Sequence, residues 1–105
     1  TRGSSGRTIG AMVVGLATVT LHLHASASLK DKRRVAKHLV AVVHSKFNVA
    51  IAEVDDHDAW TTLTLGLACV STEAGHAHAI LEHVVRAIER DRLDAELLDY
   101  RIELV

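Results

Sequence analysis

The sequence predicts an α+β fold with one four-stranded antiparallel sheet and two helices on one of its faces. Three observations predict this fold. Three stretches alternate apolar and polar residues with a period of two, a fourth is a short run rich in β-branched residues and alanine, and two longer stretches repeat apolar residues at helical spacing. Their order is strand, helix, strand, strand, helix, strand. Because each element has one apolar side, a single sheet with both helices on one face buries all of them.

The length of 105 residues fits one domain, which we place at residues 12–105. Residues 1–11 are rich in glycine, serine and arginine without periodicity, so we expect a disordered extension or a cloning remnant there. The single cysteine, Cys69, excludes an internal disulfide, and the N-terminus lacks the continuous apolar segment of a signal peptide or membrane span. We therefore expect a cytoplasmic protein without membrane contact.

The first strand is predicted at residues 12–24, where Val19 and Leu21 alternate with threonines and histidines. A helix follows, with Ser28 as its N-cap and Asp31 as the acidic half of a capping box, and it ends near residue 46. Its predicted buried stripe is centred on Leu39. The other members of the stripe are Val35, Val42 and Val43, with Leu29 and Phe47 at its margins.

The rest of the chain completes the pattern. Strands are predicted at residues 48–54 and 61–70, a second helix from a cap at Ser71 or Thr72 to about residue 91, and a last strand at residues 98–104. This order is that of the ferredoxin-like split βαβ fold, with the first and third strands in the centre. The predicted core contains Leu39, Val43, Leu65, Leu81, Val84 and Ile102, and the predicted exposed sheet face carries Thr18, Thr20, Thr62, Thr64, Arg101 and Glu103.

Charge is concentrated in the first helix. Residues 28–46 hold six lysines and arginines against one acid, a net charge of +5, whereas residues 47–62 hold four acids. Cations in the first turns oppose the helix dipole, so helix stability does not explain them. The exposed amides and the cations together favour a bound anion. The predicted RNA- or anion-binding residues are Ser28, Lys30, Lys32, Arg33, Arg34 and Lys37.

These residues favour a non-enzymatic binding protein that contacts structured RNA, including ribosomal RNA, through backbone phosphates. The alternative is that the charged face of the helix is simply exposed to solvent and binds nothing. A third interpretation is a homo-oligomer, such as a homodimer, in which the threonine-rich sheet face pairs with a second copy and a small anion binds near Ser28. A small hydrolase of the acylphosphatase kind shares only the order of elements, and that order is not evidence of chemistry.

Other polar residues have structural interpretations. His22 and His24 share one strand face but are too few for a metal site, and the helical His76, His78 and His83 scatter around their axis. The acidic connection at residues 55–58 has no nucleophile or partner carboxylate at a defined spacing. Trp60 is expected at the edge of the core and Cys69 inside it. We predict no catalytic residue, metal or cofactor.

Several short motifs point to a known family. They are Ser28-Leu29-Lys30-x-Lys32-Arg33, Lys46-Phe47-Asn48-Val49, Ala52-Glu53-Val54-Asp55-Asp56, Trp60, Thr64-Leu65-Gly66 and Val70-Ser71. Together they resemble the YlxP-like family of small uncharacterised bacterial proteins, over residues 12–105. The resemblance implies a ferredoxin-like fold, a bacterial cytosolic setting and a link to translation or ribosome assembly. It implies no known activity and no catalytic residues.

Overall fold

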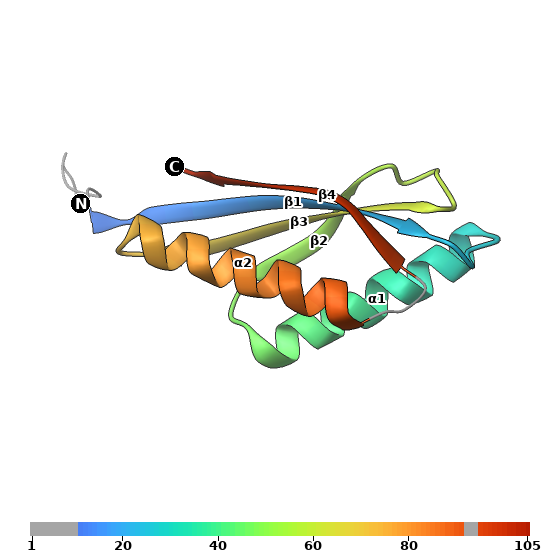
Figure 1. Cartoon of the computed structure of the whole chain (residues 1–105), viewed down its shortest axis with the longest axis horizontal. Coiled ribbons are helices and arrows are strands. Elements are labelled where there is room, and N and C mark those ends of the chain that lie inside the picture. Colours follow the sequence, from blue (N-terminus) through green and yellow to red (C-terminus); the bar gives the residue numbers. More distant parts are fainter. Residues whose placement is uncertain (1–10, 92–94) are drawn as a thin grey trace.

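The computed structural model describes residues 11–91 and 95–105. Its elements, in chain order, are β1 (Val13–Leu23), α1 (Leu29–Lys46), β2 (Ala50–Asp55), β3 (Thr62–Ser71), α2 (Ala74–Asp91) and β4 (Ala95–Leu104). The four strands form one antiparallel sheet in the order β2-β3-β1-β4 (Figure 1). The predicted ferredoxin-like fold, with β1 and β3 in the centre, is confirmed. The extension predicted at residues 1–11 lies outside the described residues except for Ala11.

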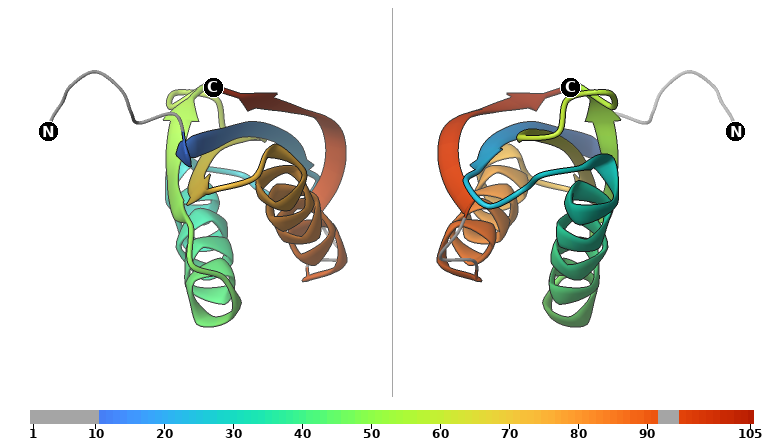
Figure 2. Two further views of the ribbon diagram at one scale, coloured as in Figure 1. Left: turned by 90° about the vertical axis from the view of Figure 1, so that its left-hand side faces the viewer. Right: turned by 90° about the vertical axis from the view of Figure 1, so that its right-hand side faces the viewer.

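The molecule has two layers. Both helices cover one face of the sheet, and the opposite face carries no helix (Figures 1 and 2). The alternation of β1 explains this arrangement, because Ala17, Val19 and Leu21 point to the helices and are buried. The antiparallel register pairs Val19 with Leu65 of β3 and with Tyr100 of β4, which places these side chains on the same inner face.

The core lies between the sheet and the helices. Five of the six predicted core residues are fully buried, namely Leu39, Val43, Leu65, Leu81 and Val84. Ile102 packs against the core but is only partly buried, because β4 is an edge strand and has no neighbour on its far side. Cys69 is buried as predicted.

The last strand begins at Ala95, three residues earlier than predicted. The register of β4 against β1 shifts between Thr20 and Leu21, and Leu98 is the residue of β4 without a partner there. Such a bulge interrupts the period-two alternation of side chains. The pattern of apolar residues therefore predicted only the part of the strand that follows the bulge.

Two residues near the connection between β2 and β3 differ from the sequence prediction. Figure 1 shows this connection rising on the helix-free side of the sheet. There the Asp56 carboxylate accepts a hydrogen bond of 2.7 Å from the Thr64 hydroxyl, and Thr64 is only 4% exposed. The prediction that Thr64 is exposed is therefore wrong. The prediction of a core-edge position for Trp60 is also wrong, because Trp60 is 54% exposed within the connection.

Candidate nucleic-acid interface

The start of α1 is fixed by a reciprocal pair of hydrogen bonds. The Ser28 hydroxyl accepts from the amide of Asp31 at 3.1 Å, so Ser28 is the N-cap as predicted. The Asp31 carboxylate accepts in return from the amide of Ala27 at 3.0 Å, one residue before the amide that the capping box predicted. A carboxylate thus already lies beside Ser28. The Ser28 hydroxyl and the Asp31 carboxylate thus both take part in the cap.

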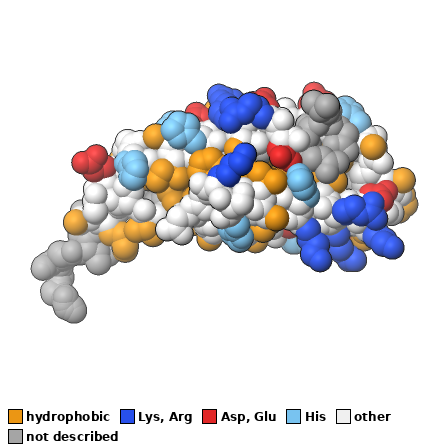
Figure 3. All heavy atoms as spheres, turned by 90° about the horizontal axis from the view of Figure 1, so that it is seen from below, with side chains coloured by type: hydrophobic (Ala, Val, Ile, Leu, Met, Phe, Trp, Pro, Cys, Tyr) orange, Lys and Arg blue, Asp and Glu red, His pale blue; other side chains and the backbone are white. Residues whose placement is uncertain are grey.

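Four cations of α1 form an exposed group, which we call the basic face: Lys30, Arg33, Arg34 and Lys37. Arg33 and Arg34 each lie three or four residues from both Lys30 and Lys37, so the four side chains project from one side of the helix. Figure 3, viewed from the helix side, shows Lys and Arg side chains gathered at lower right, over the first half of α1. Arg34 lies 3.7 Å from Asp31. In the described part of the chain, the other three make no ion pair.

Lys32 does not belong to this face. Its side chain is 1% exposed, and its ammonium donates to three backbone carbonyls, two of residues that follow β2 and one of the first residue of β3. These carbonyls belong to Asp56 at 2.5 Å, His57 at 3.2 Å and Thr62 at 3.3 Å. An ammonium enclosed in this way cannot reach a phosphate. The prediction that Lys32 is an exposed cation of the RNA-binding site is wrong.

The sequence contains two indications that Lys32 is buried. Lys32 precedes the buried Leu39 by seven residues, or about two helical turns, so the two residues share a face of the helix. The second signal is Glu53, an acid at an inward position of β2 opposite the buried Leu65. An acid and a lysine at two apolar positions indicate a buried pair. Sequence reasoning did not single out Glu53.

Glu53 supplies the counter-charge for Lys32. The carboxylate oxygen Oε2 lies 3.0 Å from the Lys32 ammonium, which makes an ion pair. The same oxygen has no hydrogen-bond partner among the described residues, so its interaction with Lys32 is that of an ion pair. The charge of Lys32 is thus neutralised inside the protein, and only the cations outside it contribute to the surface charge of α1.

The acidic connection serves the same arrangement. Asp56 has a positive φ of 56°, a conformation that an aspartate adopts more readily than most residues. Its carbonyl faces Lys32 while its carboxylate accepts from Thr64, and the carboxylate of Asp55 accepts from the Asp56 amide at 2.8 Å. These acids therefore have structural partners. Their contacts hold the connection between β2 and β3 in place.

The histidines are dispersed over the surface. The rings of His22 and His24 meet edge to face at 4.5 Å, and His24 lies 3.2 Å from the Glu96 carboxylate. His38, which the sequence analysis did not consider, joins the two helices through Asp91 at 2.5 Å. Among the described residues, no group of three or more His, Cys, Asp or Glu side chains is arranged to hold a metal ion.

A second electrostatic cluster lies away from the basic face, between α2 and β4. The Tyr100 hydroxyl donates to the Glu82 carboxylate at 2.9 and 3.1 Å, and this hydrogen bond raises the pKa of Tyr100, with burial adding to the rise. The Arg86 guanidinium lies 5.8 Å from the centre of the Tyr100 ring. The negative charge that Tyr100 acquires on ionisation, together with Glu89, raises the pKa of Arg86.

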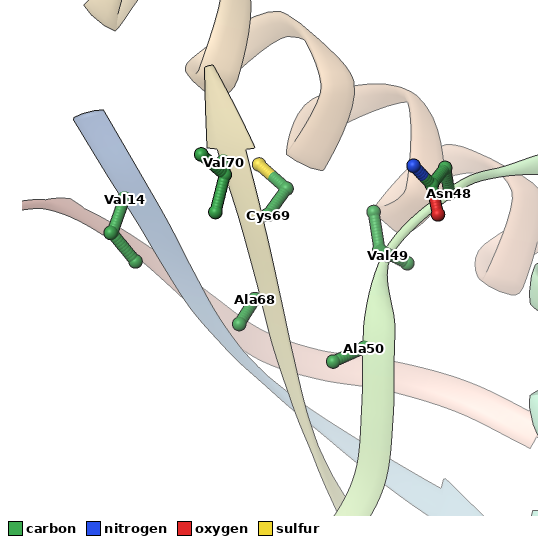
Figure 4. Close-up of a pocket in the computed structure, with 7 residues that line it drawn as sticks. All are labelled: Val14, Asn48, Val49, Ala50, Ala68, Cys69 and Val70. Carbon is green, nitrogen blue, oxygen red and sulfur yellow. The ribbon is translucent and has the colours of Figure 1, made fainter. Parts of the chain in front are cut away.

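One shallow pocket of about 400 Å³ lies where β1, β2 and β3 meet the segment before β2 (Figure 4). Its lining is mostly apolar: Val14, Asn48, Val49, Ala50, Ala68, Cys69 and Val70. Among the described residues, no charged side chain lines this pocket. Among the features described, only the basic face of α1 has the charge for an anionic ligand.

The fold and this surface define a small ferredoxin-like α+β protein with a cationic first helix. Residues 14–102 match the family described as "Protein of unknown function (DUF503)", and the chain belongs to this family. It is 32% identical over 77 residues to the "Uncharacterized protein YlxP" of Bacillus subtilis, covering 73% of this chain and 84% of that protein. The resemblance to the YlxP-like family is confirmed.

Two solved structures were compared with the fold. The de novo designed protein Foldit4 has a TM-score of 0.51 at 11% identity, over 89% of this chain and 96% of that one. A dimeric ferredoxin-like protein of unknown function from Thermobifida fusca has a TM-score of 0.37 at 14% identity, over 88% and 90% of the two chains. At 11% identity the similarity to Foldit4 concerns the fold alone. In the described part of the chain, the helices are too short or too polar to span a membrane.

Proposed function

We propose that this protein is a non-enzymatic binding protein that contacts structured RNA through the basic face of α1. The observation that carries the proposal is the set of four exposed cations on one side of a helix, three of them without an acidic partner in the described residues. Three of them, Lys30, Arg33 and Arg34, lie in the first two turns of the helix, where the dipole disfavours positive charge. Because they do not stabilise the helix, an external anion is the partner that accounts for them.

The geometry limits what this surface reads. From Lys30 to Lys37 the helix rises about 10 Å, so the basic face covers a short stretch of nucleic-acid backbone. Lysine and arginine contacts to phosphates position a complex and carry no sequence information. Base stacking on the sheet is not part of the proposal, since the described strands place no Phe, Tyr or Trp ring on the helix-free face. Recognition would depend on the charge and shape of the RNA backbone.

Salt dependence tests the proposal quantitatively. With four phosphates neutralised on a single-stranded segment, the logarithm of affinity should fall against the logarithm of salt concentration with a slope of about −3, taking about −0.7 per phosphate. Each single change to alanine in the basic face should reduce the slope by somewhat under one unit. It should also weaken all RNA sequences alike. Titration of fluorescent RNA at several salt concentrations measures both quantities.

A charge-matched control separates the basic face from general attraction. The test variant replaces the four cations of the basic face by alanine. The control replaces four exposed cations elsewhere by alanine: Lys46, Arg86, Arg90 and Arg101. Both variants have the same net charge, and circular dichroism checks that both are folded. The proposal fails if the test variant keeps the parent's affinity and slope, or if the control loses as much binding as the test variant.

The natural partner can be sought in the same way. The parent and the two variants are used to capture partners from a bacterial lysate, with and without nuclease treatment. We expect ribosomal subunits or RNA with the parent and the control, and neither with the test variant. Recovery of a partner that is insensitive to both nuclease and the loss of the basic face would contradict an RNA-binding role.

A further inference from the structure

A histidine continues the line of the basic face toward the end of α1. His44 follows Lys37 by seven residues, as Lys37 follows Lys30. Seven residues make nearly two helical turns, with a drift of about 20°, so the three side chains form a row along one side of the helix. The row from Lys30 to His44 rises about 21 Å, about twice the rise from Lys30 to Lys37. It can therefore contact a longer stretch of nucleic-acid backbone than the basic face alone.

The side chain of His44 is exposed and has no acidic partner in the described part of the chain. His38, the other histidine of α1, differs in this respect, because its ring contacts the Asp91 carboxylate of α2. The exposed residue between Lys37 and His44 on this side of the helix is Ala41, whose methyl group does not obstruct the row. A ligand that lies on the basic face therefore has access to the His44 ring.

The acids of the elements that pack against α1 are engaged elsewhere. These elements are β2 and α2, and each of their acids has another partner: Glu53 with Lys32, Asp55 with the Asp56 amide, Glu82 with Tyr100, Glu89 with Arg86, and Asp91 with His38. The other titratable side chains of α2 are basic: His76, His78, His83 and Arg90. On α1 itself the nearest charged residues along the chain are the cations Lys37 and Lys46. A positive charge on His44 is therefore available to an external anion.

His44 is the member of the row whose charge depends on the pH. A histidine side chain gains or loses a proton between about pH 5 and pH 8, whereas lysine and arginine stay charged throughout this range. A protonated imidazole carries a positive charge and donates from both ring nitrogens, so it can donate to a phosphate oxygen as an ammonium group does. His44 also lies in the last turn of α1, where the helix dipole favours positive charge.

We propose that protonated His44 is a further phosphate contact of the basic face, so that the protein binds RNA more tightly as the pH falls. This inference rests on the function proposed above. Because a nearby phosphate favours the charged form of the ring, RNA binding takes up a proton, and a lower pH therefore favours binding. The surface contacts about five phosphates when His44 is protonated and about four when it is neutral.

The salt dependence of binding measures this additional contact. Each phosphate contact on a single strand adds about −0.7 to the slope of the logarithm of affinity against the logarithm of salt concentration. We expect a slope of about −3 at the upper end of the histidine range and about −3.5 at its lower end. Relative to a reference of 1 M salt, the same coefficient corresponds to an affinity gain of about fivefold at 0.1 M salt.

Titration of a fluorescent single-stranded oligouridylate at about pH 5.5 and about pH 8 tests the proposal. His44→Gln removes the charge and should lose most of the gain in affinity at the lower pH, while keeping the parent's affinity at the higher pH. His44→Lys is charged at both pH values, so at the higher pH it should bind about as tightly as the parent does at the lower pH. The control His78→Gln removes an exposed histidine of α2 and should keep the parent's full gain.

Circular dichroism checks that every variant is folded at both pH values. A folded His44→Gln variant that gains as much affinity as the parent overturns the proposal and leaves the basic face in place as the RNA contact. If the parent does not bind the RNA through the basic face at either pH, the proposed function fails and this inference fails with it. If His44→Gln is unfolded, His44→Lys decides, because an affinity no higher than the parent's at the higher pH also overturns the proposal.

Discussion

Replacing Lys32 by methionine should be among the most destabilising changes in this protein. Methionine is close to lysine in length and fills the same space, but it removes the ammonium. The carbonyls of Asp56, His57 and Thr62 then lose their donor. Glu53, whose side chain is 18% exposed, keeps its charge without a partner. Removing one member of a buried ion pair costs about 3–5 kcal/mol, a large share of the roughly 5–15 kcal/mol that stabilises a domain.

Urea unfolding followed by circular dichroism measures this loss. Lys32→Met and the parent bury nearly the same surface on folding, so the slope of the unfolding free energy against urea concentration should be unchanged. The midpoint of the urea transition should fall by at least about 1 M. The matched control is Arg33→Met on the adjacent, exposed position, which should change the free energy of unfolding by no more than about 0.5 kcal/mol.

The double variant Lys32→Met, Glu53→Met locates the source of the loss. It removes the unpaired carboxylate, so it should be more stable than Lys32→Met alone, since apolar replacement of both partners is often tolerated. If Lys32→Met costs under about 1 kcal/mol, or if the second substitution destabilises it further, the ion pair does not have the role assigned to it.

Two further predictions concern other contacts. The lone tyrosine, Tyr100, should ionise above its ordinary pKa of about 10, and Glu82→Gln should lower its midpoint, as followed by tyrosinate absorbance. The neutral phenol is the stabilised form, so its contribution to stability is complete below the ordinary pKa and lost as the pH rises through the raised value. An unchanged midpoint in Glu82→Gln would contradict the hydrogen bond. Ser28→Ala should lower the free energy of unfolding by about 1 kcal/mol through loss of the N-cap, and an effect near zero would mean that α1 begins elsewhere.

The sequence predicted the elements whose apolar spacing is regular. The stripe of α1 around Leu39 and the alternation of β1 and β3 are uninterrupted, and all three were placed within two residues of their observed ends. The start of β4 was missed because Leu98 breaks the alternation. Thr64 and Trp60 were misplaced because their exposure depends on the path of the connection between β2 and β3, which no periodicity describes.

The candidate site was predicted in part. The spacing of Lys30, Arg33, Arg34 and Lys37 was enough to place them on the exposed side of a helix. Lys32 lies at one end of the apolar stripe, where a long side chain can reach solvent, and the prediction placed it outside; its position relative to Leu39 is that of a buried residue. Its partners are backbone carbonyls from residues more than twenty positions away, and a tertiary contact of this kind has no local pattern.

The Lys32 contact also determines which changes the connection between β2 and β3 tolerates. Its acceptors are main-chain oxygens, so the side chains of His57 and Thr62 can be exchanged without removing them. The path and the number of residues cannot be changed so freely. One inserted residue between Asp56 and Thr62 would move at least one carbonyl out of reach of the ammonium, and the helix that carries the basic face would lose an attachment to the sheet. The length of a polar surface loop is usually the most variable property of a domain. Here it is constrained by the buried charge of Lys32.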